Sequence, residues 1–172
     1  EDGRNFLLQT PFQYDIITTD ATHPVNASSW ALFTQEFYIL VAARLRSDGV
    51  FMQWLPFHNL REDDYKAILR TFQLVFPHAT LWYTGGSHTL LLATQEPLTQ
   101  AVLTAKLAAA ATNQIVIDDL GSPATIAEDW VMDADALRAY AGQGRLVTDN
   151  NAFFLPHAEE TPQILQMFEK MR

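Results

Sequence analysis

The stretch YDIITTDATHPVNASSWALFTQEFY, residues 14–38, decides the fold because it joins a strand, a loop and a helix. Tyr14 to Thr19 are mostly apolar or β-branched, which is typical of a strand covered on both faces in a parallel sheet. The strand runs directly into a carboxylate, Asp20. A loop rich in His, Pro, Asn and Ser follows, and then apolar residues recur with the period of an amphipathic helix.

The residues on both sides of this stretch continue the alternation of helices and strands. We expect a helix at 3–9, a strand at 14–19, a helix at 30–46 capped by Ser28 or Ser29 and stopped by Asp48-Gly49, a strand at 50–56, a helix at 61–75, and strands at 79–84 and 89–94 joined by a turn at 85–88. After Pro97 we expect helices at 98–111, 133–144 and 159–172. The stretch 113–130 fits either a short strand or a turn between helices.

This order of elements predicts an α/β fold whose sheet is mostly parallel, with an antiparallel edge strand, followed by C-terminal helices. Residues 97–172 contain no repeat and no low-complexity linker, so we treat them as a helical extension of the same domain as residues 1–96. The Asp2-Gly3 step looks like the end of a strand that turns into a helix. Because no such strand precedes it, we expect this chain to be a piece of a longer protein.

Composition excludes several classes of function. The formal net charge is -9, from 20 acidic and 11 basic residues, which disfavours nucleic acid as a partner. The chain has no cysteine, so disulfides, thiolate metal sites and cysteine nucleophiles are ruled out. The five histidines have no ligand-like spacing, so we expect no metal site. No apolar run reaches the length of about 20 residues that a membrane span needs.

Asp20 is the first candidate for chemistry. Ligands of open α/β sheets bind outside the carboxyl ends of the strands, which is where Asp20 and, on the next strand, Gln53 lie. A carboxylate in that place also has a plain structural role, because it can accept hydrogen bonds from the backbone of the loop that follows. The position alone leaves both readings open.

A family resemblance favours the first reading. The segments EDGRNFL, YDIITTDATHP, ASSWALFTQEFY and RSDGVFMQWLP, within residues 1–94, resemble the second half of the spermidine synthase-like proteins, the polyamine aminopropyltransferases. The segment VTDNNAFFLP, residues 147–156, resembles the tails of a longer, often membrane-fused branch, which usually carry two consecutive aspartates.

The resemblance implies a Rossmann-like fold of the S-adenosylmethionine-dependent methyltransferase type, with residues 1–96 as its C-terminal half. It implies decarboxylated S-adenosylmethionine as co-substrate and a small amine as acceptor. Asp2, with Gly3, resembles the residues that contact adenine, and Asp20 resembles the catalytic aspartate, which attracts the ammonium and accepts its proton. His23, Gln53 and Tyr83 correspond to positions around the amine.

One departure concerns the acceptor. The usual loop reads Asp-Ser-x-Asp-Pro, whereas this chain has Asp20-Ala21-Thr22-His23-Pro24. His23 replaces an anion by a neutral or partly cationic group, which weakens recognition of a diamine.

Three interpretations stay open on sequence alone. The first is an aminopropyltransferase, present here as a partial domain. The second is a related S-adenosylmethionine-dependent methyltransferase, and the third is a non-catalytic module that acts through dimerisation. The missing N-terminal half and self-association are the expected partners, and the expected location is the cytoplasm, or its membrane face for a membrane-fused protein.

Overall fold

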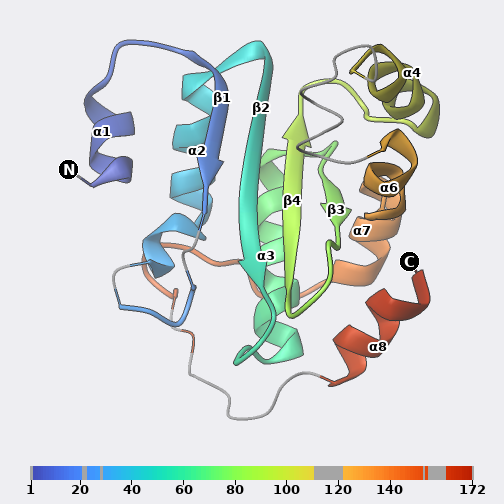
Figure 1. Ribbon diagram of the computed structural model, residues 1–172. Helices are drawn as coiled ribbons and strands as arrows, with labels where there is room; N and C mark the ends of the chain where they lie inside the picture. The colour runs from blue at the N-terminus through green and yellow to red at the C-terminus, as the bar shows by residue number, and fades with distance from the viewer. Residues whose placement is uncertain are drawn as a thin grey trace.

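A mixed β-sheet organises the computed structural model, which describes residues 2–20, 23–27, 29–110, 122–152, 154 and 162–171. In these residues the sheet has five strands in the order β1-β2-β4-β3-β5 (Figure 1). The strands are β1 (Tyr14–Thr19), β2 (Leu45–Pro56), β3 (Thr80–Trp82), β4 (His88–Thr94) and β5 (Trp130–Met132). The expected α/β class is confirmed.

The pairing of the strands differs from the expected sheet in two respects. Only β1 and β2 run parallel, and each of the other neighbouring pairs in the described sheet is antiparallel. The reversed strand of the predicted hairpin, β4, lies inside the sheet between β2 and β3, and the antiparallel strand at the edge is β5. The cause is the hairpin itself, since β4 folds back onto β3 and inserts beside β2.

The helices follow the sequence pattern closely in most places. They are α1 (Gly3–Gln9), η1 (Trp30–Leu32, a 3-10 turn), α2 (Gln35–Arg44), α3 (Glu62–Val75), α4 (Gln100–Ala110), α6 (Pro123–Glu128), α7 (Ala134–Ala141) and α8 (Pro162–Met171). The predicted short helix, the second long helix and the three helices after Pro97 are confirmed. Helix α6 lies within the stretch 113–130 and β5 begins at its last residue; neither was predicted, and residues 113–121 lie outside the described residues.

The predicted helix at 30–46 is wrong at both ends. A 3-10 turn comes first, Ser29 makes no side-chain cap bond, and Ser28 lies outside the described residues. The cap of α2 is Thr34, whose hydroxyl accepts a hydrogen bond from the backbone N–H of Phe37 at 3.3 Å. At the other end Leu45 already belongs to β2, so Asp48-Gly49 lies inside a strand instead of stopping a helix.

The irregular start of β2 explains why a turn signal occurs within a strand. The register jumps there, since β2 advances from Leu45 to Val50 while β1 advances only from Tyr14 to Ile16. The backbone at Gly49 approaches Leu45 so closely that an added Cβ would lie 2.8 Å from Leu45 Cγ. Glycine is therefore required for this close approach rather than for a helix end.

The helices α2 and α3 cover one face of the sheet and form the core with it (Figure 1). Residues that face them alternate along the strands, for example Phe51 on β2 and Leu91 on β4, both with no exposed surface. Phe51 stacks on Phe72 of α3 with ring centroids 5.5 Å apart, and Tyr38 of α2 packs edge-on against Phe72 at 5.1 Å. Interlocking aromatic rings of this kind fix the spacing between sheet and helices.

Strand β1 is not covered on both faces, contrary to the sequence prediction. Ile17 faces the core, but Ile16 is 68% exposed. In the described residues β1 is the last strand of the sheet, so no strand pairs with its outer edge and the face that carries Ile16 is left largely open. The strand's apolar character on that face has no burial to explain it in this chain.

The segment after residue 97 returns to the sheet. Strand β5 pairs with β3, α7 contacts α3, and Phe168 of α8 stacks on Tyr83 with centroids 5.3 Å apart. These contacts support the proposal that residues 97–172 extend the domain formed by residues 1–96. No helix in the described ranges is both long and apolar enough to cross a membrane.

Candidate functional site

Asp20 lies at the carboxyl end of β1, on the solvent side of the last strand residue. Thr19 is paired in register with Gln53 of β2, and Asp20 follows it with an exposed side chain. The strand pair therefore positions the Asp20 backbone at the end of β1. The alternative capping role involves the backbone of residue 22 or of His23, and residue 22 lies outside the described residues.

Asp2 is the residue that caps the start of α1. Its carboxylate caps the helix by accepting a hydrogen bond from the backbone N–H of Asn5 at 3.0 Å. One carboxylate oxygen is thus used for the cap, and the exposed side chain can offer the other to a ligand. Gly3 has open space around it, so its backbone can be approached from outside.

A cavity of about 420 Å³ brings these residues together. It runs along β1 between α1 and the start of α2. It is lined by Asp2, Gly3, Phe6, Leu7, Tyr14, Ile16, Ile17, Thr18, Thr19, Asp20, Leu32 and Phe37. Two carboxylates lie among mostly apolar walls, which is the usual composition of a small-molecule site. The sequence analysis did not predict the apolar residues that line the cavity, although the apolar residues of the predicted helix at 3–9 could have indicated one of its walls.

His23 does not line this cavity and is held as a neutral ring. Its Nε2 lies 2.9 Å from the carbonyl oxygen of His58, so Nε2 carries the proton and donates. Its Nδ1 accepts from the backbone N–H of Val25 at 3.3 Å. Burial lowers the pKa of His23, and the nearby His58 acts in the same direction, while the bond to the His58 carbonyl opposes them. Both ring nitrogens are therefore engaged by backbone groups, Nδ1 within the loop and Nε2 at His58.

Gln53 and Tyr83 lie apart from the cavity as well. Gln53 is fully buried, where its Oε1 accepts from the Tyr38 hydroxyl at 2.6 Å and its Nε2 donates to the carbonyl of Leu32 at 2.8 Å. Tyr83 is 3% exposed and donates its hydroxyl to the carbonyl of Gly86 at 3.1 Å. Each side chain is occupied by a structural contact, and their predicted place around an amine stays a prediction.

The structure gathers histidines that the sequence spacing kept apart. The rings of His23 and His58 meet edge-on with centroids 4.8 Å apart, and Trp54 lies 6.5 Å from His58 and 5.8 Å from His88. The register of β2 and β4, in which Pro56 pairs with His88, brings Trp54 and His88 together. Among the described residues no group of three or more His, Cys, Asp or Glu could hold a metal ion.

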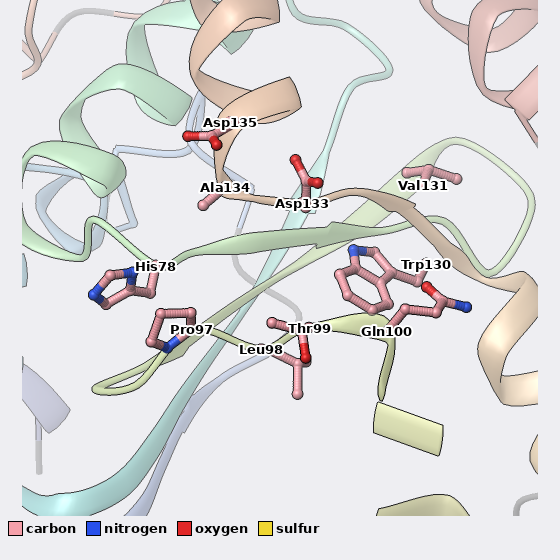
Figure 2. A pocket seen from close by; sticks show the side chains of 10 residues that line it. All are labelled: His78, Pro97, Leu98, Thr99, Gln100, Trp130, Val131, Asp133, Ala134 and Asp135. Atoms are coloured by element: carbon pink, nitrogen blue, oxygen red, sulfur yellow. The ribbon is translucent and has the colours of Figure 1, made fainter. Parts of the chain in front are cut away.

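A second cavity of about 410 Å³ lies at the opposite edge of the sheet, between β5, α7 and the segment that follows β4 (Figure 2). Its carboxylates already have partners. Asp133 caps α7 through the backbone N–H of Ala136 at 2.8 Å, and Asp135 pairs with Arg138 at 2.7 Å. Size does not separate the two cavities. The first differs in lying at the carboxyl end of the parallel strand β1, where ligands of open α/β sheets bind.

Comparison with known proteins matches this part of the chain. A family model for the spermine/spermidine synthase domain matches residues 1–85. This part of the chain is therefore spermidine synthase-like in sequence. The synthase-like part therefore contains α1, β1, η1, α2, β2, α3 and β3, with both carboxylates of the cavity.

Curated relatives and a solved structure extend the match. The chain is 37% identical over 78 residues to polyamine aminopropyltransferase 2 of Pseudomonas aeruginosa, covering 44% of this chain and 22% of that protein. It is 31% identical over 123 residues to the polyamine aminopropyltransferase of Erwinia tasmaniensis, covering 66% of this chain and 43% of that protein. A probable spermidine synthase from Corynebacterium glutamicum shares the fold, with a TM-score of 0.57 at 18% identity over 87% of this chain and 52% of that one. The chain thus spans less than half the length of these two curated relatives.

Proposed function

We propose that this chain carries part of the active site of a polyamine aminopropyltransferase. The observation that supports it is one cavity lined by both Asp2 and Asp20, in a chain whose first 85 residues match the spermine/spermidine synthase domain. In this proposal the nucleoside of decarboxylated S-adenosylmethionine lies along the cavity, with its adenine at Asp2 and Gly3. The acceptor amine approaches Asp20.

The chemistry assigned to Asp20 follows from its position. An amine is protonated near neutral pH and is not nucleophilic until it loses that proton. A carboxylate at the strand end attracts the ammonium and accepts a hydrogen bond or a proton from it. The nitrogen then attacks the aminopropyl carbon beside the sulfonium, one C–N bond forms, and the C–S bond breaks with its electron pair going to sulfur. The products are the alkylated amine and methylthioadenosine.

The environment of His23 supports a restricted choice of acceptor. Its ring is neutral and both nitrogens are bonded to backbone groups of Val25 and His58, so it offers no charge to a second ammonium. The neighbouring Trp54, His58 and His88 present aromatic surface. We therefore propose an acceptor that offers one ammonium to Asp20.

A fusion tests the activity directly. The N-terminal part of the Erwinia tasmaniensis relative, joined to this chain at the start of the matched region, supplies the remainder of the domain. We expect release of methylthioadenosine from decarboxylated S-adenosylmethionine in the presence of an amine. Asp20→Asn removes the charge but keeps the size, and a rate loss of about 10²-fold is expected.

Two controls decide the interpretation. Asp15→Asn changes a carboxylate on the same strand that pairs with Arg46 on the surface, and its rate should match that of the unmodified fusion. An Asp20→Asn fusion that turns over at the unmodified rate would reduce Asp20 to a loop residue. Transfer of a methyl group from S-adenosylmethionine instead would favour the methyltransferase alternative.

We also propose that the chain self-associates through β1. Strand β1 is an edge strand of the described sheet, and Ile16 on it and Phe6, Leu8 and Phe12 before it are exposed apolar side chains. Such edges pair readily with another strand.

A further inference from the structure

The loop at residues 145–151 lies outside the family match, yet it reaches the wall of the candidate cavity. Arg4 of α1 makes a two-pronged contact with Asp149, its Nη1 donating to Oδ1 at 2.9 Å and its Nη2 to Oδ2 at 2.6 Å. Nη1 also donates to the carbonyl of Ala31 in η1 at 2.9 Å. One guanidinium therefore ties together α1, η1 and the loop.

Asp149 is itself held on the start of α2. Its backbone N–H donates to Glu36 Oε2 at 3.0 Å, and the N–H of Gln35 donates to the carbonyl of Val147 at 2.8 Å. The hydrogen bond from Arg4 lowers the pKa of Asp149, while burial acts against it. The carboxylate is therefore charged at neutral pH, as a charge-assisted fork contact requires.

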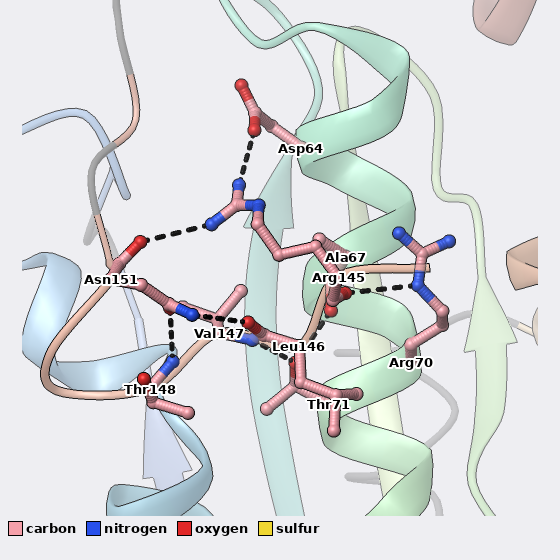
Figure 3. Close-up of polar contacts among 9 residues, drawn as sticks. All are labelled: Asp64, Ala67, Arg70, Thr71, Arg145, Leu146, Val147, Thr148 and Asn151. Atoms are coloured by element: carbon pink, nitrogen blue, oxygen red, sulfur yellow. Dashed lines mark hydrogen bonds and ion pairs between the residues drawn. The ribbon is translucent and has the colours of Figure 1, made fainter. Parts of the chain in front are cut away.

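The rest of the loop is fixed on α3, as Figure 3 shows. The N–H of Val147 donates to the hydroxyl of the buried Thr71 at 2.8 Å. Arg145 pairs with Asp64 at 2.5 Å, and Asn151 Oδ1 accepts from the N–H of Thr148 at 2.7 Å. The loop is thus anchored on one side to α3, which belongs to the core, and on the other side to α1.

Helix α1 depends on contacts of this kind. It has seven residues, of which only Leu7 is buried, and its first turn begins at Gly3 and is capped by Asp2. An isolated helix of this length is not stable in water, so its position depends on tertiary contacts. Besides Arg4, the described polar contacts include that of Arg44 Nε with the carbonyl of Leu7 at 2.9 Å, near its far end. The Arg4–Asp149 pair acts at the end that carries Asp2 and Gly3.

We propose that Asp149, acting through Arg4, is a positioning residue that sets α1, and with it Asp2, against the cavity that also contains Asp20. The nucleoside part of this assignment rests on the proposed function above. The C-terminal loop thereby contributes to a site whose lining residues all lie in the first 37 residues of the chain.

Hydrogen exchange on the whole chain tests the positioning. In Asp149→Asn and Arg4→Gln we expect the amides of residues 3–9 to exchange about tenfold faster, while those of α3 keep their protection. Asp149→Glu keeps the charge and both oxygens and should restore slow exchange. Arg4→Lys should restore it only in part, because an ammonium cannot reach both Asp149 oxygens and the Ala31 carbonyl in a fixed fork.

Asp135→Asn is the matched control, since it removes an exposed pair with Arg138 on α7. It should leave residues 3–9 unchanged. Unchanged exchange of residues 3–9 in Asp149→Asn would overturn the proposal. Faster exchange of α3 to the same extent would overturn it too, because Asp149 would then support the whole fold and not α1.

A titration with methylthioadenosine, followed by the amide signal of Gly3, connects the positioning to the site. We expect Asp149→Asn to weaken the affinity by about tenfold and Asp149→Glu to recover it. Equal affinity in Asp149→Asn, despite faster exchange, would overturn the positioning role. If the Gly3 amide signal of the unmodified chain does not shift on addition of methylthioadenosine, this would count against the proposed nucleoside site. The hydrogen exchange of the α1 amides would then decide the role of Asp149.

Discussion

At the scale of single residues, Gln53 shows how a polar residue near a strand end can be structural. Both ends of its amide are used inside the protein, by the Tyr38 hydroxyl and the Leu32 carbonyl. A buried donor or acceptor left without a partner costs about 1–3 kcal/mol. The residue therefore joins η1, α2 and β2, and through them it holds the cavity walls Leu32 and Phe37 in place.

A substitution at Gln53 separates the structural role from a direct contact with the amine. We expect Gln53→Ala to lower the free energy of unfolding by roughly 2–4 kcal/mol, from two unpaired groups and a small cavity. Urea titration measures it. The shorter side chain of Gln53→Asn cannot span both partners, so this variant should lose part of the same stability. A fully stable Gln53→Ala chain that loses only amine affinity would support the predicted place at the amine instead.

The pair of Arg4 and Asp149 predicts a pH dependence with a definite sign. The pKa of Asp149 is lowered in the folded chain, mainly by the hydrogen bond from Arg4. The contribution of Asp149 to the free energy of unfolding is therefore complete above the unfolded pKa of about 3.9. It is lost as the pH falls through the folded pKa. Because both side chains are partly exposed, we expect the pair to stabilise the fold by no more than about 1 kcal/mol.

Unfolding free energies of the unmodified chain and of Asp149→Asn measure this effect. The difference between the two should be constant from about pH 5 to 7 and should vanish as the pH falls below about 4. A difference that persists at low pH would show that the asparagine is harmful for a reason other than the lost charge.

At the scale of elements, the start of α2 differs from the start that the sequence pattern predicts. Ser29 follows the sequence pattern of a helix cap, but the chain makes a 3-10 turn first and Thr34 caps the helix. The buried Thr34 hydroxyl also donates to the carbonyl of Ala31 at 3.3 Å. The tertiary contact of Gln35 with Val147 fixes the helix start, and no local signal reports it.

The two candidate caps give a direct comparison. We expect Thr34→Ala to cost about 0.5–2 kcal/mol of stability, because the Phe37 amide loses its acceptor. Ser29→Ala should change stability by less than about 0.5 kcal/mol, since Ser29 makes no cap bond. Thermal or urea unfolding of both variants checks this, and the reverse order of effects would restore the cap predicted from sequence.

The elements predictable from the chain were those with a strong local pattern. Helix α3 has acidic residues in its first turn and a regular apolar period, and the hairpin of β3 and β4 has a glycine pair at its turn. The place of β4 inside the sheet, and the meeting of His23, His58 and Trp54, depend on strand order and register. Neither strand order nor register can be predicted from the local periodicity of the sequence.

The candidate site divides in the same way. Asp2 and Asp20 were predicted from their places after strands and from a family motif, and the structure places both on one cavity. Arg4 and Asp149 were not predicted, because 145 positions separate them in the chain. A pair at that separation has no signal in a single sequence, and only the packing of the loop at 145–151 reveals it.

At the scale of the whole molecule, the open side of β1 determines how the chain behaves in solution. The cavity runs along this edge of the described sheet, so we expect a ligand there to be covered only in part. Tight binding of a small molecule needs burial of most of its surface. We therefore expect the unmodified chain alone to bind methylthioadenosine more weakly than micromolar. Calorimetry measures this, and micromolar binding would show that the described walls suffice.

The same edge predicts self-association. Strand β1 contains neither proline nor lysine, which are common protections of an edge, and Ile16 and Phe12 are each 68% exposed. Sedimentation should therefore show an oligomer whose share grows with concentration, and hydrogen exchange should show protection also of the amides in residues 14–19 that do not pair with β2. Ile16→Lys places a charge on the apolar face and should shift the chain to the monomer, whereas Ile39→Lys, on the exposed side of α2, should not. A monomer at high concentration, in which the β1 amides not paired with β2 exchange freely, would mean that the chain tolerates this edge, and the proposed association through β1 would be wrong.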